Sequence, residues 1–508
     1  MNASHNRFET VSLLVVVFTV GGAVMVLEIL GSRILGPYFG AGLYVWSGII
    51  SVTLLSLALG YWLGGLLADR WNQLSTLTGL TFAAALLILL IPTARPLVLT
   101  HAGRLGFRPG VLVSAFLLFF PPLTLLGMVT PAAVKLHTRN LANLGLTAGR
   151  LYAVSTLGSL LGTLLTGFVL LPAFGTARVL HFTAGLLVLL ALITGARNKC
   201  SQSLVPLVGL AVLLFPILGR QTPAGQMIDP WRVLHRSESL YGNLVVAESG
   251  TTRHLLVDGT VQSAIELKSR ELVFASHRLI LEILGRVAPA RGQTRSRLLV
   301  VGLAGGVLPT KLSDSRWDIQ IVEIDGRMPE VARDFFGWNP RRFRFTEDDG
   351  RHFLQTHTER FDAIVLDAFV GEVIPAHLLT RESFELARAR LRPHGLLLLN
   401  TIAFQRGKST VIPASIARTL STAFSHVVLC PLRKEGNFGN IVFVAAGQER
   451  VPRPFAPAGA CAPPSEVLEE PGIVLTDDRN PLETWWVKNS ALARRALWEV
   501  VDRRVLFE

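Results

Sequence analysis

The sequence predicts a multi-pass α-helical membrane domain followed by an α/β domain with a small β subdomain at its start. Residues 1–220 form a series of long apolar segments separated by short charged stretches. From residue 297 onward, short apolar strands alternate with helical patterns, which is typical of a parallel, doubly wound sheet. The chain has 508 residues, half of them hydrophobic, and a mean hydropathy of +0.45, enough for two or three domains.

The net charge of +13 lies almost wholly in the apolar half. Residues 1–220 hold 13 Lys or Arg and three acids, whereas residues 221–508 hold 36 and 33. A basic excess between apolar segments is typical of membrane loops that face anionic lipid, so the lipid bilayer is the expected partner. The second half has no basic stripe interleaved with aromatic residues, which argues against nucleic acid.

Seven apolar segments are expected to cross the bilayer as helices, because most approach the ~20 residues that a span requires. Loop Lys and Arg residues number seven on one side and five on the other. With seven spans, this weak bias would place the second half outside the cytoplasm. The expected segments are 11–35, 44–67, 75–93, 111–131, 152–172, 178–195 and 203–219.

The three cysteines are Cys200, Cys430 and Cys461, and their spacing indicates neither a metal site nor a disulfide framework. This is typical of reducing surroundings, and we expect no bound metal. The first apolar run is long and has no clear small-residue cleavage site, so no cleavable signal peptide is expected.

The second half begins with a linker over 221–239 and a hairpin near 243–248 and 253–259, then a helix over 265–285. Strands follow at "RLLVVG", "IQIVEID", "RFRFTE", "FDAIVLD" and "GLLLLN", with helices over 327–336 and 381–391. The expected domains are a membrane domain (1–220), a linker and β subdomain (221–262), a Rossmann-like domain (263–448), and a loose Pro/Ala-rich segment with the C-terminal tail (449–508).

Ligands of such sheets bind outside the carboxyl ends of the strands. The strand "RLLVV" is followed by glycines at 302, 305 and 306, which either form a simple turn or let the backbone approach a ligand. Glu323 ends the next strand, 21 positions after Gly302. An acid at that spacing is typical of a ribose contact, and the alternative is a solvated strand end.

Two further strand ends carry acids. Asp349 and Gly350 follow the third strand, where an acid can accept a hydrogen bond from an adenine amino group. The alternative is a common Asp-Gly turn. Asp367 ends the fourth strand, "FDAIVLD". Because parallel strands end at one edge of a sheet, we expect all four ends to meet at one cleft, with Asp367 near the reactive end of a bound nucleoside.

Residues 237–445 resemble the polyamine aminopropyltransferases, the spermidine synthase family. The resemblance rests on "LLVDGTVQS", "VVGLAGGVLP", "VEIDGRMPEVA", "EDDGRHFL", "FDAIVLDAF", "IPAHLLTRESFELARARLRPHGLLLLN" and, further on, "LTDDRNPLE". The N-terminal half is similar to the membrane domain fused to some bacterial members, through "LEILGSRILGPYFG" and "LGYWLGGLLADR".

The resemblance implies a Rossmann-like, methyltransferase-type fold behind a small β domain. It also implies a transferase of polyamine and spermidine biosynthesis. Such enzymes move an aminopropyl group from decarboxylated S-adenosylmethionine, a co-substrate and not a permanent cofactor, to a diamine such as putrescine, and they release methylthioadenosine. Family members commonly form homo-oligomers. No metal is needed, because the sulfonium leaves as a neutral thioether.

The resemblance also assigns roles to individual residues. Asp367 matches the proton-accepting Asp, which would bind an ammonium and take its proton during attack. The expected donor contacts are Gly302, Gly305, Glu323, Asp349, Gly350 and Pro375, and the expected substrate contacts are His277, Gln262 and Tyr241.

Three positions depart from the family pattern. Ala304 stands where an Asp normally binds the donor's amine, Val370 where a second acid helps bind the diamine, and Gly242 where a Gln is expected. Glu372 could replace one of these acids. The nucleoside half of the site is therefore better preserved than the cationic half.

Two other interpretations remain open. One is an S-adenosylmethionine-type transferase with a less cationic acceptor, such as a lipid. The other is a transporter or sensor with a nucleoside-thioether-binding domain, which an acid inside the first apolar segment, Glu28, would fit unless it pairs with Arg33. Because the donor should be cytosolic, we expect the catalytic half on the cytoplasmic side of the cell membrane, against the loop charge count.

Overall fold

The structure is a computed structural model, and it forms two compact units that meet in the sequence between Pro223 and Ala224. The division lies close to residue 220, where the composition changes. The structure describes residues 2–39, 42–71, 73–138, 144–195, 227–288, 295–312, 316–369, 371, 374–406, 410–432, 438–447, 461–486, 501 and 505.

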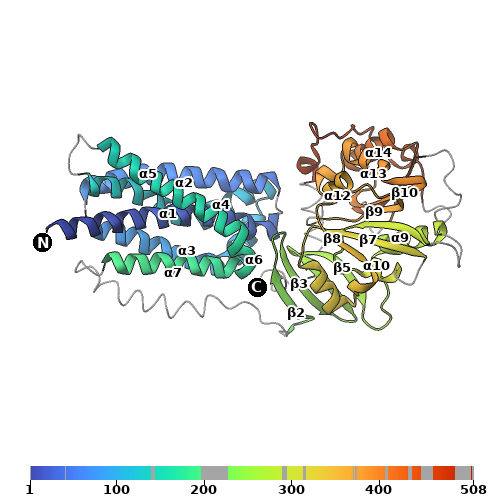
Figure 1. The fold of residues 1–508 in the computed structure, drawn as a ribbon, viewed down its shortest axis with the longest axis horizontal. Helices are drawn as coiled ribbons and strands as arrows, with labels where there is room; N and C mark the ends of the chain where they lie inside the picture. Colours follow the sequence, from blue (N-terminus) through green and yellow to red (C-terminus); the bar gives the residue numbers. More distant parts are fainter. Residues whose placement is uncertain are drawn as a thin grey trace. The chain divides into compact units, whose positions relative to one another are not determined.

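The first unit consists of long apolar helices (Figure 1). In the described part of the chain, six helices are long and apolar enough to cross a membrane. The seventh expected segment, 203–219, lies outside the described residues. The helices are α1 (Asn2–Phe39), α2 (Leu43–Arg70), α3 (Leu74–Gly103), α4 (Phe107–His137), α5 (Leu144–Leu165) with the π-helical η2 (Thr166–Leu170) and α6 (Leu171–Phe174), and α7 (Thr176–Gly195).

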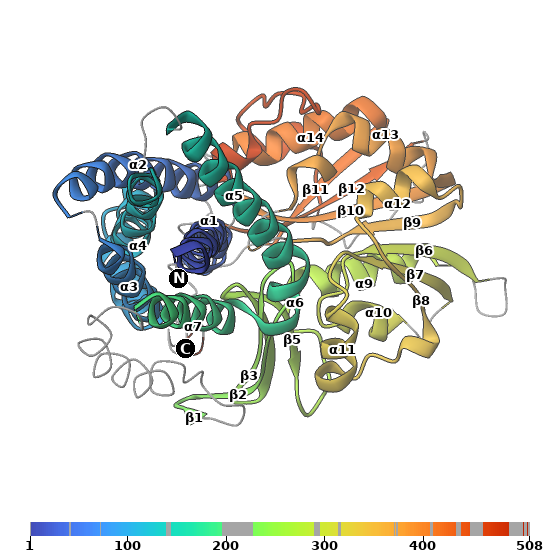
Figure 2. The same cartoon turned by 60° about the vertical axis from the view of Figure 1, so that its left-hand side comes forward.

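Helix α1 packs against α2, α3, α4, α5 and α7, and Figure 2 shows it between them. Small residues permit close approach: a Cβ at Gly158 of α5 would overlap the backbone of Phe18 in α1, and one at Gly64 of α2 would overlap the backbone of Met128 in α4. Ser159 also donates a hydrogen bond to the carbonyl of Gly21. Such contacts are typical of helices that associate in a membrane, where apolar burial gives little driving force.

The second unit begins with a five-stranded antiparallel sheet in sequential order, which includes the expected hairpin as β3 and β4. The helix expected over 265–285 begins only at Ala275, because β5 continues to Glu266 and Ile265 then bridges to Leu272. The expected boundary at 262 therefore falls inside a strand. The strands are β1 (Met227–Ile228), β2 (Trp231–Glu238), β3 (Asn243–Ser249), β4 (Thr252–Val257) and β5 (Thr260–Glu266), and the helix is α9 (Ala275–Val287).

A seven-stranded sheet forms the centre of this unit, in the order β11-β12-β10-β9-β6-β7-β8. The sheet was expected to be parallel, but β12 is antiparallel to both β10 and β11, because it turns back and inserts between them. The five strands expected from sequence are all present. They are β6 (Ser296–Val301), β7 (Trp317–Glu323), β8 (Arg344–Glu347), β9 (Phe361–Leu366) and β10 (Leu391–Phe404), and they are joined by β11 (His426–Pro431) and β12 (Phe438–Ala446).

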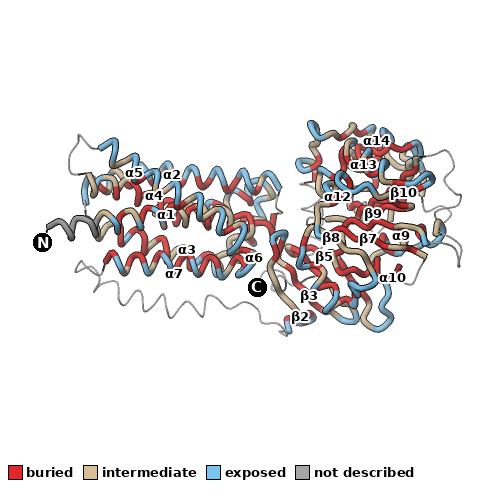
Figure 3. Tube along the Cα trace, in the orientation of Figure 1, coloured by how far each residue is buried: buried red, intermediate tan, exposed pale blue. Residues whose placement is uncertain are grey.

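Helices cover both faces of this sheet, so apolar, buried residues run along its central strands β6, β9 and β10 (Figure 3). Leu298 and Val300 belong to one apolar layer, and Leu299 and Val301 belong to the other. The helical elements are α10 (Val307–Leu312), α11 (Met328–Val331) with η3 (Ala332–Phe336), η4 (Pro340–Arg342), α12 (Gly350–Thr356), η5 (Ala376–Leu378), α13 (Arg381–Ala389), α14 (Val411–Ala423) and α15 (Pro464–Val467).

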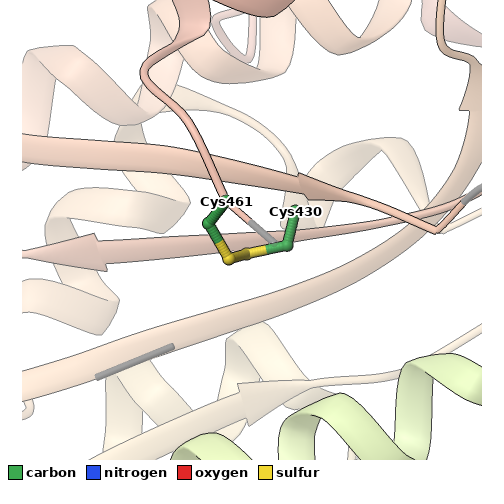
Figure 4. Close-up of a disulfide and its surroundings, with 2 residues drawn as sticks. All are labelled: Cys430 and Cys461. Atoms are coloured by element: carbon green, nitrogen blue, oxygen red, sulfur yellow. A yellow bond between two sulfur atoms is a disulfide. The ribbon is translucent and has the colours of Figure 1, made fainter. Parts of the chain in front are cut away.

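The segment expected to be loose contributes buried side chains to the core in its described part. Leu475, Leu482 and Trp486 are at most 2% exposed and belong to the apolar layer formed with α12, α13 and α14. Cys430 of β11 forms a disulfide with Cys461 (Figure 4), although their spacing predicted none. Sequence spacing misses this bond because the fold brings together residues that are 31 positions apart.

We expect Cys461→Ser to destabilise the oxidised protein, because the disulfide restricts the unfolded chain. For a loop of this length the loss is roughly 2–4 kcal/mol. The thermal unfolding midpoint of the full-length protein in detergent should fall by several degrees, and a reductant should lower the wild type to the same value. Cys200→Ser, which leaves the pair intact, is the control. Equal midpoints for Cys461→Ser and wild type under oxidising conditions would contradict this role.

Candidate functional site

The strand ends singled out in the sequence meet at one cavity of about 320 Å³. Strands β7, β6 and β9 are parallel neighbours in register, so Glu323, Gly302 and Asp367 lie side by side at their carboxyl ends. The cavity is lined by Tyr241, Gln262, His277, Gly302, Glu323, Asp349, Gly350, Asp367 and Pro375, together with other residues. Gly305 is the one expected site residue outside this lining, and it packs against Ser263, which does line the cavity.

The glycines after β6 are required by close packing within the protein. Gly302 has a φ of +101°, and a Cβ there would overlap the carbonyl oxygen of Asp367. A Cβ at Gly305 would lie 2.7 Å from the hydroxyl oxygen of Ser263. This turn therefore places the start of α10 against the ends of β6 and β9 without a side chain between them.

Glu323 holds the glycine turn through backbone hydrogen bonds. Its Oε2 accepts from the N–H of Leu303 at 2.8 Å, and its Oε1 accepts from the N–H of Asp325 at 3.0 Å. Burial raises the pKa of Glu323, while the backbone donors of Leu303, Asp325 and Ala304 act in the opposite direction. Three backbone donors leave part of the acceptor capacity of this carboxylate for a ligand hydroxyl.

Asp349 caps helix α12. Its Oδ1 accepts from the N–H groups of Arg351 and His352, and its Oδ2 lies 2.9 Å from Nε2 of His377. The hydrogen bond from His377 lowers the pKa of Asp349, so its carboxyl stays ionised to lower pH than usual. Gly350 is needed beside it, because a Cβ there would overlap Val301. The Asp-Gly pair therefore begins a helix, and a lone pair of Asp349 Oδ2 remains for a ligand.

Asp367 is held on both carboxylate oxygens. Its Oδ2 lies 2.8 Å from Nε2 of His277, and its Oδ1 accepts from Nδ2 of Asn400 at 2.8 Å. The side chains of His277 and Asp367 are only 10% and 13% exposed. Asn440 donates in turn to Oδ1 of Asn400 at 3.1 Å.

Sequence reasoning missed Asn400 and Asn440, although both line the cavity. Asn400 follows the apolar run "LLLL" of β10, which is the same signal that singled out Asp367 after "AIVL". A polar residue directly after an apolar run was therefore a usable signal at this position. Asn440 lies in β12, a strand that the sequence did not predict.

The remaining expected residues lie at the rim. Tyr241 is 41% exposed. Partial burial raises its pKa, and the negative charges of four nearby carboxylates raise it further (Asp325, Glu347, Asp349 and Glu323). Gln262 donates from Nε2 to the carbonyl of Gly371 at 2.6 Å, so its amide already binds the loop after β9. Pro375 begins the turn η5, which carries His377.

The structure gives a physical reason for one of the three departures from the family pattern, the one at Gly242, whereas the backbone at Ala304 would suit the Asp that the family has there. A Cβ at Gly242 would meet Val257 and Asp258, so a Gln would not fit there without rearrangement. Ala304 lines the cavity with a φ of +45°, a conformation that only Gly, Asn and Asp adopt readily. Val370 and Glu372 lie outside the described residues.

The cavity is acidic. Five carboxylate residues are in its lining, whereas no Lys or Arg is among the described residues that form it. No group of three or more His, Cys, Asp or Glu in the described part of the chain could hold a metal ion. The arrangement suits a cationic ligand with hydroxyl groups, and the lining carboxylates are Glu323, Asp325, Asp348, Asp349 and Asp367.

The strand order, with one antiparallel strand inserted beside β10, and the acidic cavity at the carboxyl ends of the strands are those of a Rossmann-like, methyltransferase-type domain. The expected fold class is therefore confirmed: long apolar helices precede an α/β unit of this type. No protein-family model matches the chain.

Relatives of known name share this domain. A polyamine aminopropyltransferase of Vibrio vulnificus is 28% identical over 215 residues, which are 40% of this chain and 68% of that protein. A polyamine aminopropyltransferase of Oceanobacillus iheyensis is 24% identical over 382 residues, 69% of this chain and 70% of that protein. The latter alignment covers about 350 residues of this chain, more than the 283 from Ala224 to Leu506, so it includes part of the helical unit.

A solved structure of a probable spermidine synthase from Corynebacterium glutamicum superposes with a TM-score of 0.38 and 22% identity, over 42% of this chain and 81% of that one. The relationship to the polyamine aminopropyltransferases that the sequence motifs predict is confirmed by the named relatives. These relatives indicate an enzyme of the aminopropyltransferase type.

We expect Ala304→Gly to stabilise the protein by about 1 kcal/mol, because glycine adopts a positive φ without steric cost. The thermal unfolding midpoint in detergent measures the change. Ala368→Gly is the matched control, since Ala368 also lines the cavity but is not among the described residues with positive φ. There, glycine should be destabilising. A similar fall in both variants would show that Ala304 is not strained.

Proposed function

We propose that the α/β unit is a polyamine aminopropyltransferase that moves an aminopropyl group from decarboxylated S-adenosylmethionine to putrescine or a related amine and releases methylthioadenosine. The observation that carries the proposal is one acidic cavity in which Asp367 lies beside Gly302 of the glycine turn and Glu323 at the end of β7. The names of the relatives support the same reaction.

In this proposal, Glu323 binds the ribose hydroxyls and Asp349 binds the adenine amino group. Both carboxylates are fixed by backbone N–H groups before any ligand arrives, and both retain acceptor capacity for a ligand. Gly302 and Gly350, which line the cavity, contribute backbone to the nucleoside site, Gly305 supports this turn through its packing against Ser263, and Pro375 lies on the adenine side.

Transfer requires a neutral amine, whose nitrogen lone pair attacks the aminopropyl carbon bound to sulfur. The C–N bond forms as the C–S bond breaks, and the C–S electron pair stays on sulfur as a neutral thioether. The acceptor arrives as an ammonium, so it must give up one proton before the attack, and the secondary ammonium that forms keeps the other two. A free primary ammonium has a pKa near 10.4, so it has no free lone pair at neutral pH. A carboxylate that accepts its proton therefore makes the nitrogen nucleophilic.

Asp367 is the group we assign to that proton transfer. His277 and Asn400 fix its two oxygens, so the carboxylate needs no reorientation when the amine arrives. His277 acts here through Asp367, and Gln262 and Tyr241 border the space in which the acceptor would lie.

The acceptor is the least determined part of the proposal. Ala304 offers no charge to the donor's amine, and no acid beyond those already named lies in the described lining near Asp367. A transferase that uses another S-adenosylmethionine-type donor or a less cationic acceptor is therefore the second candidate, and Ala304 is the observation that favours it.

We expect Asp367→Asn to lower the rate of methylthioadenosine release from donor plus putrescine by about 10²–10⁴-fold, the usual contribution of a general base. Binding of methylthioadenosine, followed by calorimetry on the full-length protein in detergent, should change little. Asp334→Asn, an exposed acid paired with Arg333, is the control. Equal binding of decarboxylated donor, S-adenosylmethionine and methylthioadenosine, with no release onto any diamine, would refute the proposal.

We further propose that the helical unit holds the enzyme in the inner cell membrane with the lipid bilayer as partner, and that the protein forms homo-oligomers. A cytosolic donor requires the α/β unit on the cytoplasmic side. The disulfide, which persists in oxidising compartments, and the loop charge count both favour the opposite side.

A pair of C-terminal reporter fusions tests this orientation. A reporter that is active only in the cytoplasm should give signal, and one that is active only outside should not. The reverse result would place the cavity outside and require a donor supplied there.

A further inference from the structure

Residues Leu475–Leu482 pack against the elements that carry Asp349 and His377. Nδ2 of Asn480 donates to the carbonyl of Ala376 at 2.8 Å, and the N–H of Arg381 donates to the carbonyl of Leu475 at 2.9 Å. Leu475 and Leu482 are fully buried. This segment, which we call the C-terminal strap, is therefore fixed against the turn η5 and the start of α13.

Asp477 of the strap forms a bidentate ion pair with Arg351. Asp477 accepts from Nη1 and Nη2 of Arg351 at 2.6 and 2.5 Å. The Arg351 side chain is 16% exposed and that of Asp477 is 43% exposed. The hydrogen bond from Arg351 lowers the pKa of Asp477, so the pair stays charged at neutral pH.

Arg351 connects the strap to the cavity. Its Nη1 also donates to the carbonyl of His377 at 3.1 Å, and Nε2 of His377 lies 2.9 Å from Oδ2 of Asp349. His377 and Asp349 line the cavity, whereas Asp477 and Arg351 are not in its described lining. A continuous chain of contacts therefore runs from Asp477 through Arg351 and His377 to Asp349.

We propose that Asp477 is a positioning residue of the donor site, which acts through Arg351 to hold His377 against Asp349. Without Asp477, the Arg351 guanidinium loses its two charge-assisted hydrogen bonds, and its bond to the carbonyl of His377 is held less firmly. The proposal rests on the proposed function in one respect, that the bound nucleoside contacts Asp349. Asp477 itself touches no ligand.

The test compares Asp477→Asn with Asp478→Asn in the full-length protein in detergent. Asp478 is the adjacent exposed acid, and no hydrogen bond or ion pair of its side chain is present among the described contacts. Asp477→Asn should weaken methylthioadenosine binding about 3- to 10-fold, the scale of a partly exposed two-pronged ion pair. The backbone amides of Arg351 and His352, which Asp349 caps, should also exchange hydrogen faster. Asp478→Asn should match wild type in both measurements, and Asp477→Glu should recover part of each loss.

A positioning role also predicts that the KM for the donor changes while kcat does not. The KM for the donor should rise in Asp477→Asn, while kcat at saturating donor and the KM for the amine stay near wild type. Unchanged hydrogen exchange and unchanged nucleoside binding in Asp477→Asn would overturn the proposal, as would equal effects of both variants. If the wild type binds no nucleoside, the proposed function fails, and hydrogen exchange at Arg351 and His352 alone decides whether Asp477 holds this region.

Discussion

The site depends on how Asp367 is held at the end of β9. Its N–H donates to the carbonyl of Val301, and its own carbonyl occupies the space that a Cβ at Gly302 would need. Its side chain lies between His277 of α9 and Asn400 of β10. Three adjacent strands and one helix thus converge on a single residue, and both oxygens of its carboxylate are held by hydrogen bonds. A proton acceptor fixed in this way costs no reorganisation when a substrate binds.

The acidic lining explains which ligands the cavity can hold. Two opposite unit charges 4 Å apart interact by about 4 kcal/mol at an effective dielectric constant of 20, so five carboxylates without a lysine or arginine in the described lining strongly favour cations. A sulfonium donor and an ammonium acceptor are both cations. Repulsion among the carboxylates is offset by the hydrogen bonds that Glu323 and Asp349 accept from backbone N–H groups.

The sequence predicted the parts of this fold whose pattern is local. Strands β6, β9 and β10 contain near-continuous apolar runs because both faces of the sheet are covered, and the acids at or just after the ends of β7, β8 and β9 stand out in the sequence. Strand β12 was missed because insertion between β10 and β11 depends on contacts distant in sequence. Asn440, the Cys430–Cys461 disulfide and the packing of Leu475 share that cause. The pairing of His277 with Asp367 was equally beyond sequence reasoning, since 90 positions separate them.

The buried side chains of Leu475, Leu482 and Trp486 have a consequence for how the protein is made. They complete the apolar layer over α12, α13 and α14, yet the ribosome adds them after every strand of the sheet. The nascent chain must therefore keep that layer partly uncovered until these residues emerge, a stage at which exposed apolar surface favours aggregation. Chains that terminate before residue 475 would retain all seven strands and still lack part of one core.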